Sequence, residues 1–267
     1  MNLLKRTAVG VIGVPAIYLL IRAGSWFLLA LVVAQAGLAA REFYALAGKA
    51  RPLARAGIIL AAAVPLAVFF AVEGRKPEWA VLALLIAVAV SSAAALGAID
   101  SVEGAISRIS ITGFGIFYLG GLFSLQLFLR QGPAGADWLL LAYLATWCVD
   151  IGSYLAGSVL GRHKLSPVLS PGKTWEGAAG GVVFAVAAGW LAGTAVLGLF
   201  GPLTAVLYGV AIAVAAPAGD LVESVWKRDA GVKDSSGIIP GHGGILDRFD
   251  SLLLTVPVTL VFRFLAE

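Results

Sequence analysis

Long apolar segments constrain the fold of this chain more than any other feature. Residues 7–40 contain one charged side chain, Arg22, and a single helix of that length would measure about 50 Å, too long for one membrane crossing. We therefore divide this stretch at residues 22–25. Further apolar segments cover residues 56–72, 79–99, 111–129, 138–161, 177–200, 202–219 and 251–265. The pattern predicts an all-α integral membrane protein, a polytopic helical bundle with about nine transmembrane helices.

The composition excludes an ordinary soluble domain. Of the 267 residues, 60% are hydrophobic and 13% are charged, and the mean hydropathy is +0.95, values typical of membrane proteins. Cys148 is the single cysteine, so no intrachain disulfide can form. Lys5 and Arg6 precede the first apolar segment, as in a signal peptide, but further apolar segments follow at once. We expect the first segment to be retained as a transmembrane helix.

Lysine and arginine residues are distributed unequally between the connections. With the N-terminus placed inside, 14 of the 19 lysine and arginine residues fall on the inner side. Trp26, Trp79 and Trp138 then begin segments on the outer side, where interfacial aromatic residues are common. Because positive charge favours the cytoplasmic side, the sequence predicts an N-in, C-out orientation.

Acidic residues within the apolar segments gather in the second half of the chain. Asp150 lies inside the sixth expected span, and Asp220 and Glu223 lie at the end of the eighth. Ionisable groups at membrane depth are costly and usually mark function. We expect residues 1–140 to provide scaffold and lipid contact and residues 141–267 to carry the site, within one continuous membrane domain.

The stretch from residue 219 to residue 250 is rich in carboxylates. Asp220, Glu223 and Ser224 have the i, i+3, i+4 spacing that places side chains on one helix face, and Asp247 and Asp250 repeat the i, i+3 spacing. Clustered oxygen ligands suit a hard cation such as Mg²⁺ far better than zinc. The spacing therefore predicts a magnesium site.

Basic side chains and glycines lie between these carboxylates. Lys227, Arg228, Lys233 and Arg248 are accompanied by a glycine-rich turn at residues 240–244. Cations and closely approaching backbone are what bound phosphates need. The stretch therefore predicts a combined metal and phosphate site. The alternative is a solvated cytoplasmic loop whose charges only keep it in water.

A second polar stretch covers residues 150–177. Its Gly172-Lys173-Thr174 sequence suggests a phosphate-binding P-loop, but Pro167 stands where that motif requires glycine. The stretch is instead a cationic loop interrupted by proline, followed by the start of the next expected helix, whose free N–H groups can bind an anion. The alternative is a loop whose positive charges only fix the topology.

Together the two stretches resemble the phosphatidate cytidylyltransferase (CDP-diacylglycerol synthase) family. The family's C-terminal signature is met at Ser224, Lys227, Arg228, Lys233, Asp234, Ser236, Ile239, Pro240, His242, Gly243, Gly244, Ile245, Asp247, Arg248 and Asp250. The upstream stretch matches at Asp150, Tyr154, Gly157, Gly161, Ser170, Pro171, Lys173, Thr174, Glu176 and Gly177. Ser153 and Ser158 depart from the family's pattern, in which alanine and a basic residue are usual. The resemblance covers about residues 150–251.

The resemblance implies a nucleotidyltransferase of phospholipid biosynthesis. The implied reaction converts CTP and phosphatidic acid to CDP-diacylglycerol and pyrophosphate with Mg²⁺ as cofactor, a second cation being left open. The implied location is the inner (plasma) membrane, as a multi-pass protein whose active site faces the cytoplasm. CTP, phosphatidic acid and membrane lipids are the implied partners, without nucleic acid, and a homodimer is left open.

Roles for individual side chains follow as hypotheses. The expected metal ligands are Asp220 and Asp247, with Asp250 and Glu223 as further or supporting ligands. The expected catalytic residues are Asp220, Asp247, Lys227, Arg228 and Asp250. The expected substrate contacts are Lys173, Thr174, Ser224, Lys233, His242, Gly243, Gly244, Arg248 and Asp150. His242 could instead organise its loop, and Asp150 could contact the metal or the cytidine, or pair with Arg162 or Lys173.

Other membrane functions are weighed against this interpretation. A secondary transporter also concentrates carboxylates near broken helices, but its charges are expected near the bilayer midplane and in both halves of a repeat. A lipid-alcohol kinase or a CDP-archaeol synthase would also use CTP at the membrane. A CDP-alcohol phosphotransferase fits less well, because its D-G-x2-A-R series is missing. A purely structural scaffold would leave the paired carboxylates unexplained.

Overall fold

The described part of the chain is almost entirely helical. The structure, a computed structural model, describes residues 3–97, 102–239 and 243–267, with side chains described from Gly10 onward. Within these residues, eight helical segments are long and apolar enough to cross a membrane, and Gly10–Ala23 forms a shorter apolar helix. The all-α polytopic fold is therefore confirmed, whereas the count of nine spans and the N-in, C-out orientation stay predictions.

The chain divides into two compact units. The first comprises Met1–Phe128 and Asp229–Phe249, and the second comprises Leu129–Arg228 and Asp250–Glu267. The expected division of roles near residue 140 is a functional one and stays a prediction. The helices of the first unit are α1 (Leu3–Ala23), α2 (Ser25–Leu46), η1 (Ala47–Ala50), α3 (Ala54–Glu73), α4 (Pro77–Leu96), α5 (Ala105–Gly115), the π-helical segment η2 (Ile116–Gly121), α6 (Leu122–Leu129) and α10 (Leu246–Phe249).

The first apolar stretch breaks where the sequence predicts. Gly24, between α1 and α2, has φ 64° and ψ −154°, a backbone conformation that glycine adopts without steric cost. The two helices are therefore separate, which confirms the division at residues 22–25. The helix α2 continues past Ala40, where the expected span ended, to Leu46, so Arg41 and Glu42 are helical.

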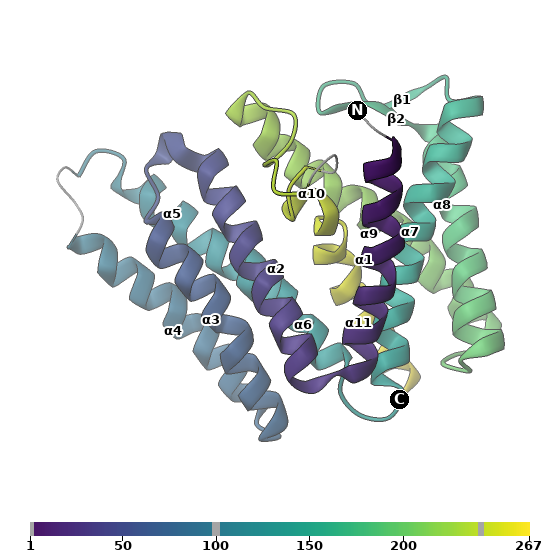
Figure 1. Ribbon diagram of the computed structural model, residues 1–267, viewed down its shortest axis with the longest axis horizontal. Coiled ribbons are helices and arrows are strands. Elements are labelled where there is room, and N and C mark those ends of the chain that lie inside the picture. The colour runs from purple at the N-terminus through teal and green to yellow at the C-terminus, as the bar shows by residue number, and fades with distance from the viewer. Residues whose placement is uncertain (1–2, 98–101, 240–242) are drawn as a thin grey trace. The chain divides into compact units, whose positions relative to one another are not determined.

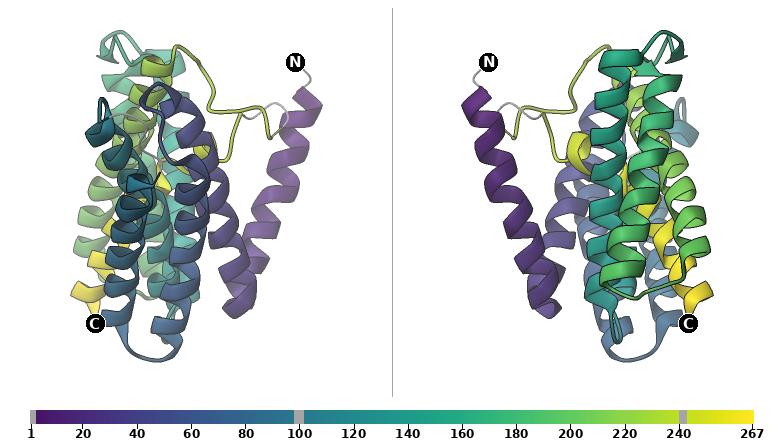
Figure 2. Two further views of the ribbon diagram at one scale, coloured as in Figure 1. Left: turned by 90° about the vertical axis from the view of Figure 1, so that its left-hand side faces the viewer. Right: turned by 90° about the vertical axis from the view of Figure 1, so that its right-hand side faces the viewer.

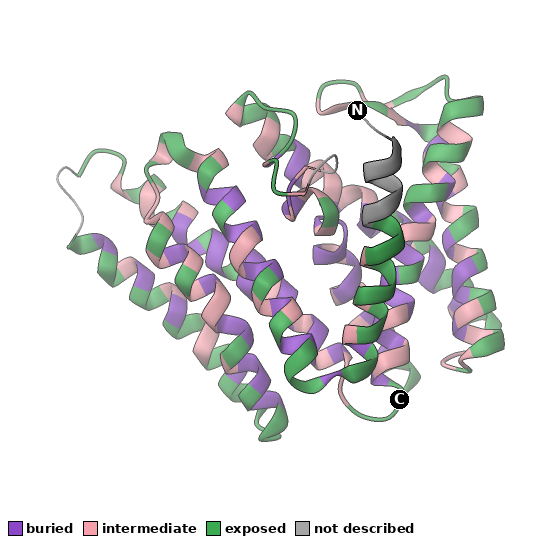
Figure 3. Ribbon diagram, in the orientation of Figure 1, coloured by how far each residue is buried: buried purple, intermediate pink, exposed green. Residues whose placement is uncertain are grey.

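Helices α2, α3 and α4 pack in sequence order within the first unit (Figure 1). In the apolar part of α2, 50% of the residues are buried, whereas in the apolar part of α4 the share is 22%. The ribbon of α4 is accordingly coloured largely as exposed in Figure 3. In the buried face of α2, Gln35 accepts a hydrogen bond of 2.8 Å from Gln126. The α2 helix thus contributes a buried polar contact to the interior of the unit.

The second unit builds a helix pair carrying a hairpin at one end. Helices α7 and α8 lie side by side, and Figure 2 shows the hairpin beyond their ends. An antiparallel two-stranded sheet pairs Lys164 with Thr174 and Ser166 with Ser170, an element that the sequence did not predict. The elements are α7 (Gly135–Leu160), β1 (Lys164–Ser166), β2 (Ser170–Thr174), α8 (Trp175–Ala188), the π-helical segment η3 (Gly189–Val196), α9 (Pro202–Ala230) and α11 (Leu252–Ala266).

Buried hydroxyl pairs tie α11 to its neighbours. Thr255 lies 2.8 Å from Thr146 of α7, and Thr259 lies 3.1 Å from the hydroxyl of Tyr208 on α9. These bonds cross a core formed mainly by Leu141, Ala145, Val149, Ala185, Tyr208, Ile212, Ala213 and Ala216. Hydrogen bonds between helices are satisfied inside the bundle, as burial away from water requires. They fix the register in which α11 follows Asp250.

Replacing Gly180 by alanine should loosen the contact between α7 and α8. A Cβ at this position would lie 2.6 Å from the carbonyl oxygen of Gly152 and would clash with Ala156. Because backbone cannot yield cheaply, we expect a loss of about 1–3 kcal/mol in unfolding free energy, measured as a lower Tm in detergent. Gly13→Ala is the matched control, since Gly13 also lies inside a helix and its Cβ would meet nothing within 4 Å. Equal Tm values for the two variants would contradict the close contact.

Candidate active site

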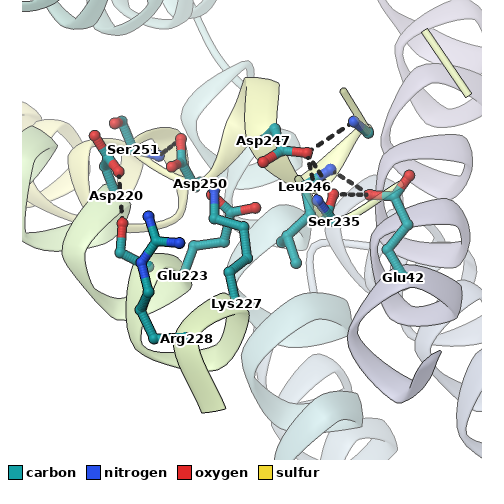
Figure 4. A network of polar contacts seen from close by, with 12 residues as sticks. Glu42, Asp220, Glu223, Lys227, Arg228, Ser235, Leu246, Asp247, Asp250 and Ser251 are labelled. Carbon is teal, nitrogen blue, oxygen red and sulfur yellow. Dashed lines mark hydrogen bonds and ion pairs between the residues drawn. The ribbon is translucent and has the colours of Figure 1, made fainter. Parts of the chain in front are cut away.

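Three carboxylates come together in the second unit. Asp220 and Glu223 project from α9, and Asp250 lies just before α11 (Figure 4). One oxygen from each side chain lies within 4.8 Å of the others, and Glu223 and Asp250 are only 1% and 8% exposed. The structure therefore brings together three of the four side chains expected to hold a metal. Their role as ligands stays a prediction.

Gly219 allows the backbone of Asp250 to lie close to α9. A Cβ at Gly219 would lie 2.5 Å from the carbonyl oxygen of Asp250 and 3.0 Å from the Cα of Ser251. Ser251 then donates from its hydroxyl to the carbonyl of Ala216 at 3.0 Å, and its N–H donates to Asp250 Oδ1 at 2.7 Å. The absence of a side chain at residue 219 thus brings Asp250 to the carboxylate face of α9.

Two lysines neutralise part of the cluster's charge. Lys173 of β2 places its Nζ 2.6 Å from Asp220 Oδ2, and Lys227 of α9 places its Nζ 2.8 Å from Glu223 Oε2. Ser224 donates to Asp220 Oδ1 at 3.3 Å. These two ion pairs place positive charge directly beside the cluster, as buried carboxylates require.

The cluster has the chemistry of a site for a hard divalent cation. All three donors are carboxylate oxygens, the ligands that Mg²⁺ and Ca²⁺ prefer. Oxygens on opposite sides of such an ion lie about 4–5 Å apart, so the observed spacing of up to 4.8 Å is compatible with shared coordination. Asp220, Glu223 and Asp250 could therefore hold a divalent ion.

The hairpin that carries Lys173 is fixed to the start of α8. Thr174 caps the helix by accepting a hydrogen bond from the N–H of Gly177 at 3.1 Å. Glu176 accepts from the N–H of Arg162 at 3.1 Å, and its Oε1 lies 2.6 Å from His163 Nδ1. These bonds join both ends of the hairpin to the start of α8, so that Lys173 is held at a defined position.

Two further bonds hold the hairpin on α9. Lys173 donates to the carbonyl of Pro217 at 3.4 Å, and Arg228 Nε donates to the carbonyl of Leu169 at 3.2 Å. Both basic residues were expected to contact phosphates. In the structure, both side chains also hold the hairpin against α9 through hydrogen bonds. Their contacts with phosphate stay predictions.

A pocket of about 310 Å³ opens beside the cluster. This volume is within the range of small-molecule sites, about 300–1,000 Å³. Asp220 and Lys173, which form the ion pair, both line it, as do Asp150 and Thr174. The remaining lining residues are Val149, Ser153, Tyr154, Leu165, Gly172, Gly177, Ala178 and Pro217. A ligand in this pocket would contact a carboxylate of the candidate metal cluster directly.

The rest of the signature lies in the first unit, in the segment of residues 231–245 between α9 and α10, here called the signature loop. Asp247, which follows it in α10, accepts at Oδ2 from the N–H of Ser235 at 2.9 Å, from the Ser235 hydroxyl at 2.6 Å and from the N–H of Gly244 at 2.8 Å. Asp247 thus organises the loop, and its expected role as a metal ligand stays a prediction.

The other signature residues are placed as follows. Gly243 has φ +78°, and its carbonyl accepts from the N–H of Ile239 at 2.9 Å. Lys233 and Arg248 are exposed, as phosphate-binding side chains must be. His242 lies outside the described residues. Contacts of Lys233, Arg248, Gly243 and Gly244 with substrate stay predictions.

Sequence reasoning did not identify Glu42. This carboxylate of α2 is 2% exposed and accepts hydrogen bonds from residues of the signature loop and α10 (Figure 4). The signal was present, because Gln35 and Glu42 are seven residues apart and therefore share one face of an otherwise apolar helix. The expected span ended at Ala40 and left Glu42 outside it.

Comparison with known proteins identifies related chains. A model described as the cytidylyltransferase family matches residues 4–266. The chain is 37% identical over 153 residues to a phosphatidate cytidylyltransferase of Haemophilus influenzae, covering 55% of this chain and 53% of that protein. It is 37% identical over 147 residues to the Pseudomonas aeruginosa protein of the same name, covering 55% and 54%. With the Synechocystis protein of that name, identity is 45% over 130 residues, covering 49% and 44%. The chain thus spans about half the length of the curated relatives it matches.

Asp250→Asn should weaken divalent cation binding. The substitution removes one negative charge from the cluster, and because changes even to residues that support metal ligands cost 10–100-fold in affinity, we expect a loss of at least about tenfold. Titration calorimetry with Mn²⁺ alone, on detergent-solubilised protein, measures the affinity without any assay of activity. Asp137→Asn is the control, since Asp137 precedes Asp150 on α7 by about 20 Å of helix. Equal affinity of the Asp250→Asn and unmodified proteins would remove Asp250 from the metal site.

Proposed function

Because the chain belongs to the cytidylyltransferase family, we propose that it transfers the cytidylyl group of CTP to phosphatidic acid, forming CDP-diacylglycerol and pyrophosphate. The observation that carries this proposal is the three-carboxylate cluster beside the pocket: Asp220 belongs to both, and its ion-pair partner Lys173 also lines the pocket. The names of the relatives, which are phosphatidate cytidylyltransferases, support the choice of substrates.

The proposed chemistry joins two polyanions. An oxygen of the lipid phosphate attacks the α-phosphorus of CTP, a new phosphorus–oxygen bond forms, and the bond to the β-phosphate oxygen breaks, which releases pyrophosphate. A phosphate monoester is already largely ionised at neutral pH, so no strong general base is required. The main barrier is electrostatic repulsion between the substrates, and fixed positive charge lowers it.

The chain's own residues fit this task. Lys173 faces the pocket from the hairpin, where it can exchange Asp220 for a phosphate oxygen, and Lys227, Arg228, Lys233 and Arg248 are the further cationic side chains of the signature. Asp220, Glu223 and Asp250 would hold the cation, with Asp247 as an additional ligand. A bound divalent ion, Mg²⁺ in our proposal with a second cation left open, would supply positive charge to the phosphates.

We place the reaction at the cytoplasmic face of the inner (plasma) membrane. The excess of lysine and arginine on one side of the expected topology supports this orientation. CTP is water-soluble whereas phosphatidic acid stays in the leaflet, so the pocket must be reached from both phases. A homodimer is left open.

The direct test of the proposed function is product analysis. Detergent-solubilised protein is incubated with CTP labelled in the cytidine and with phosphatidic acid, with and without Mg²⁺. We expect labelled CDP-lipid and pyrophosphate in equal amounts, and neither product after chelation. Phosphorylated lipid without pyrophosphate would indicate a kinase, and turnover with an archaeal diether lipid but not with phosphatidic acid would indicate a CDP-archaeol synthase. CTP left unchanged would favour a transporter.

Asp247→Asn should reduce kcat/KM about a hundredfold or more, comparable to the loss of one group that stabilises transition-state charge. The amide oxygen of asparagine can take the place of Oδ2 and retain the bonds from Ser235 and Gly244, so that the substitution removes mainly the second oxygen and the charge. Asp137→Asn, measured beside it, should retain the activity of the unmodified protein. Near-native turnover of Asp247→Asn would exclude Asp247 from catalysis.

A further inference from the structure

Glu42 lies far from the signature loop in sequence but contacts it in the structure. We propose that Glu42 is a positioning residue, which fixes the signature loop on α2 and, through Ser235, orients Asp247. This inference rests on the proposed function for its catalytic consequence only. The anchoring itself can be measured without substrate.

Four donors converge on the Glu42 carboxylate. Oε1 accepts from the hydroxyl of Ser236 at 2.6 Å and from the N–H of Ile245 at 3.0 Å. Oε2 accepts from the N–H of Leu246 at 2.7 Å and lies 3.1 Å from the hydroxyl of Ser235, which shares its single proton between Glu42 and Asp247. These donors come from both ends of the stretch that contains the glycine-rich turn. One side chain of α2 therefore closes the loop.

Only a carboxylate satisfies this arrangement. Each oxygen faces one backbone N–H and one hydroxyl, so a glutamine in either orientation would turn its NH₂ group toward a backbone N–H. A hydroxyl can rotate to accept, but a backbone N–H can only donate. Glu42→Gln must therefore break at least one bond to the loop, although its size is unchanged. Aspartate is too short to span the same donors.

Ser235 links Glu42 to Asp247. Its hydroxyl lies 2.6 Å from Asp247 Oδ2 and 3.1 Å from Glu42 Oε2, and its N–H donates to the same Asp247 oxygen. Gly244 fits between these groups, because a Cβ there would clash with both Ser235 and Glu42. A displacement of Glu42 would therefore be transmitted to Asp247 through a tightly packed contact.

The burial of Glu42 indicates that its carboxylate has a structural function inside the unit. The side chain is 2% exposed within a helix whose other buried residues are mainly apolar, and a buried charge is costly unless it is fully hydrogen-bonded. Among the described residues, the groups that donate to Glu42 all belong to residues 235–246. A second tie, from Lys49 Nζ to the carbonyl of Asp229 at 2.8 Å, holds the chain just before the loop. The C-terminal part of α2 and the following η1 thus contact both the signature loop and the residue that precedes it.

Hydrogen exchange tests the anchoring. In the substrate-free, detergent-solubilised full chain, the amides of Ile245 and Leu246 should be protected, and Glu42→Gln should speed their exchange about tenfold or more, as expected when a local hydrogen bond opens. Gln35→Ala is the matched control, because Gln35 is equally buried on α2 and bonds to Gln126. It should lower Tm without changing exchange at these two amides.

Kinetics test the positioning role. A lost folded fraction lowers apparent kcat but leaves KM unchanged, whereas a displaced loop should raise the KM for CTP. We expect Glu42→Gln to raise this KM and lower kcat/KM about tenfold or more, the usual effect of losing a residue that supports a metal ligand. Gln35→Ala should leave KM within about twofold. Ser236→Ala removes one of the groups that donate to Glu42. It should speed amide exchange at residues 245 and 246 and raise the KM for CTP, each by less than Glu42→Gln does. This variant keeps the test available if Glu42→Gln does not fold.

Hydrogen exchange and kinetics together distinguish a failure of the anchoring by Glu42 from a failure of the proposed function. Unchanged exchange at residues 245 and 246 in Glu42→Gln would overturn the anchoring. Faster exchange with unaltered KM would overturn the positioning role. If the unmodified protein forms no CDP-lipid, the proposed function fails, while the exchange data still decide whether Glu42 anchors the loop.

Discussion

Electrostatic repulsion among closely spaced carboxylates is the constraint on which the rest of the structure depends. Asp220, Glu223 and Asp250 lie within 4.8 Å of one another in a chain that is 60% hydrophobic. Such a cluster persists where positive charge offsets it or where one carboxyl group keeps its proton. Lys173 and Lys227 supply part of that charge, and a cation would supply the remainder. The cluster could therefore hold a cation, as we propose.

The surrounding elements serve this cluster in two ways. Close packing at Gly219 brings Asp250 against α9. The hairpin, which is bonded to the start of α8 and to α9, places Lys173 beside Asp220 although the two residues are far apart in sequence. In the first unit, Glu42 performs a comparable task for the signature loop, with a carboxylate accepting from backbone N–H groups. Polar groups in both units are thus positioned by helices whose remaining surfaces are apolar.

Local sequence rules predicted the features that depend on local geometry. The break at Gly24 and the shared face of Asp220 and Glu223 follow from backbone preference and helix periodicity. Contacts between distant residues were not accessible in this way. Lys173 and Asp220, or Glu42 and Leu246, meet only because the helices pack as they do, and no spacing rule relates such positions. The hairpin was missed because its strands are three and five residues long and are fixed mainly by Glu176 and Thr174.

Anomalous diffraction from Mn²⁺ tests the central claim most directly. Crystals of the full chain grown with Mn²⁺ and phosphatidic acid should show a peak about 2–2.5 Å from oxygens of Asp220, Glu223 and Asp250, beside the pocket that Lys173 lines. A protein that is active with Mn²⁺ but whose ion lies away from these three carboxylates would contradict the account.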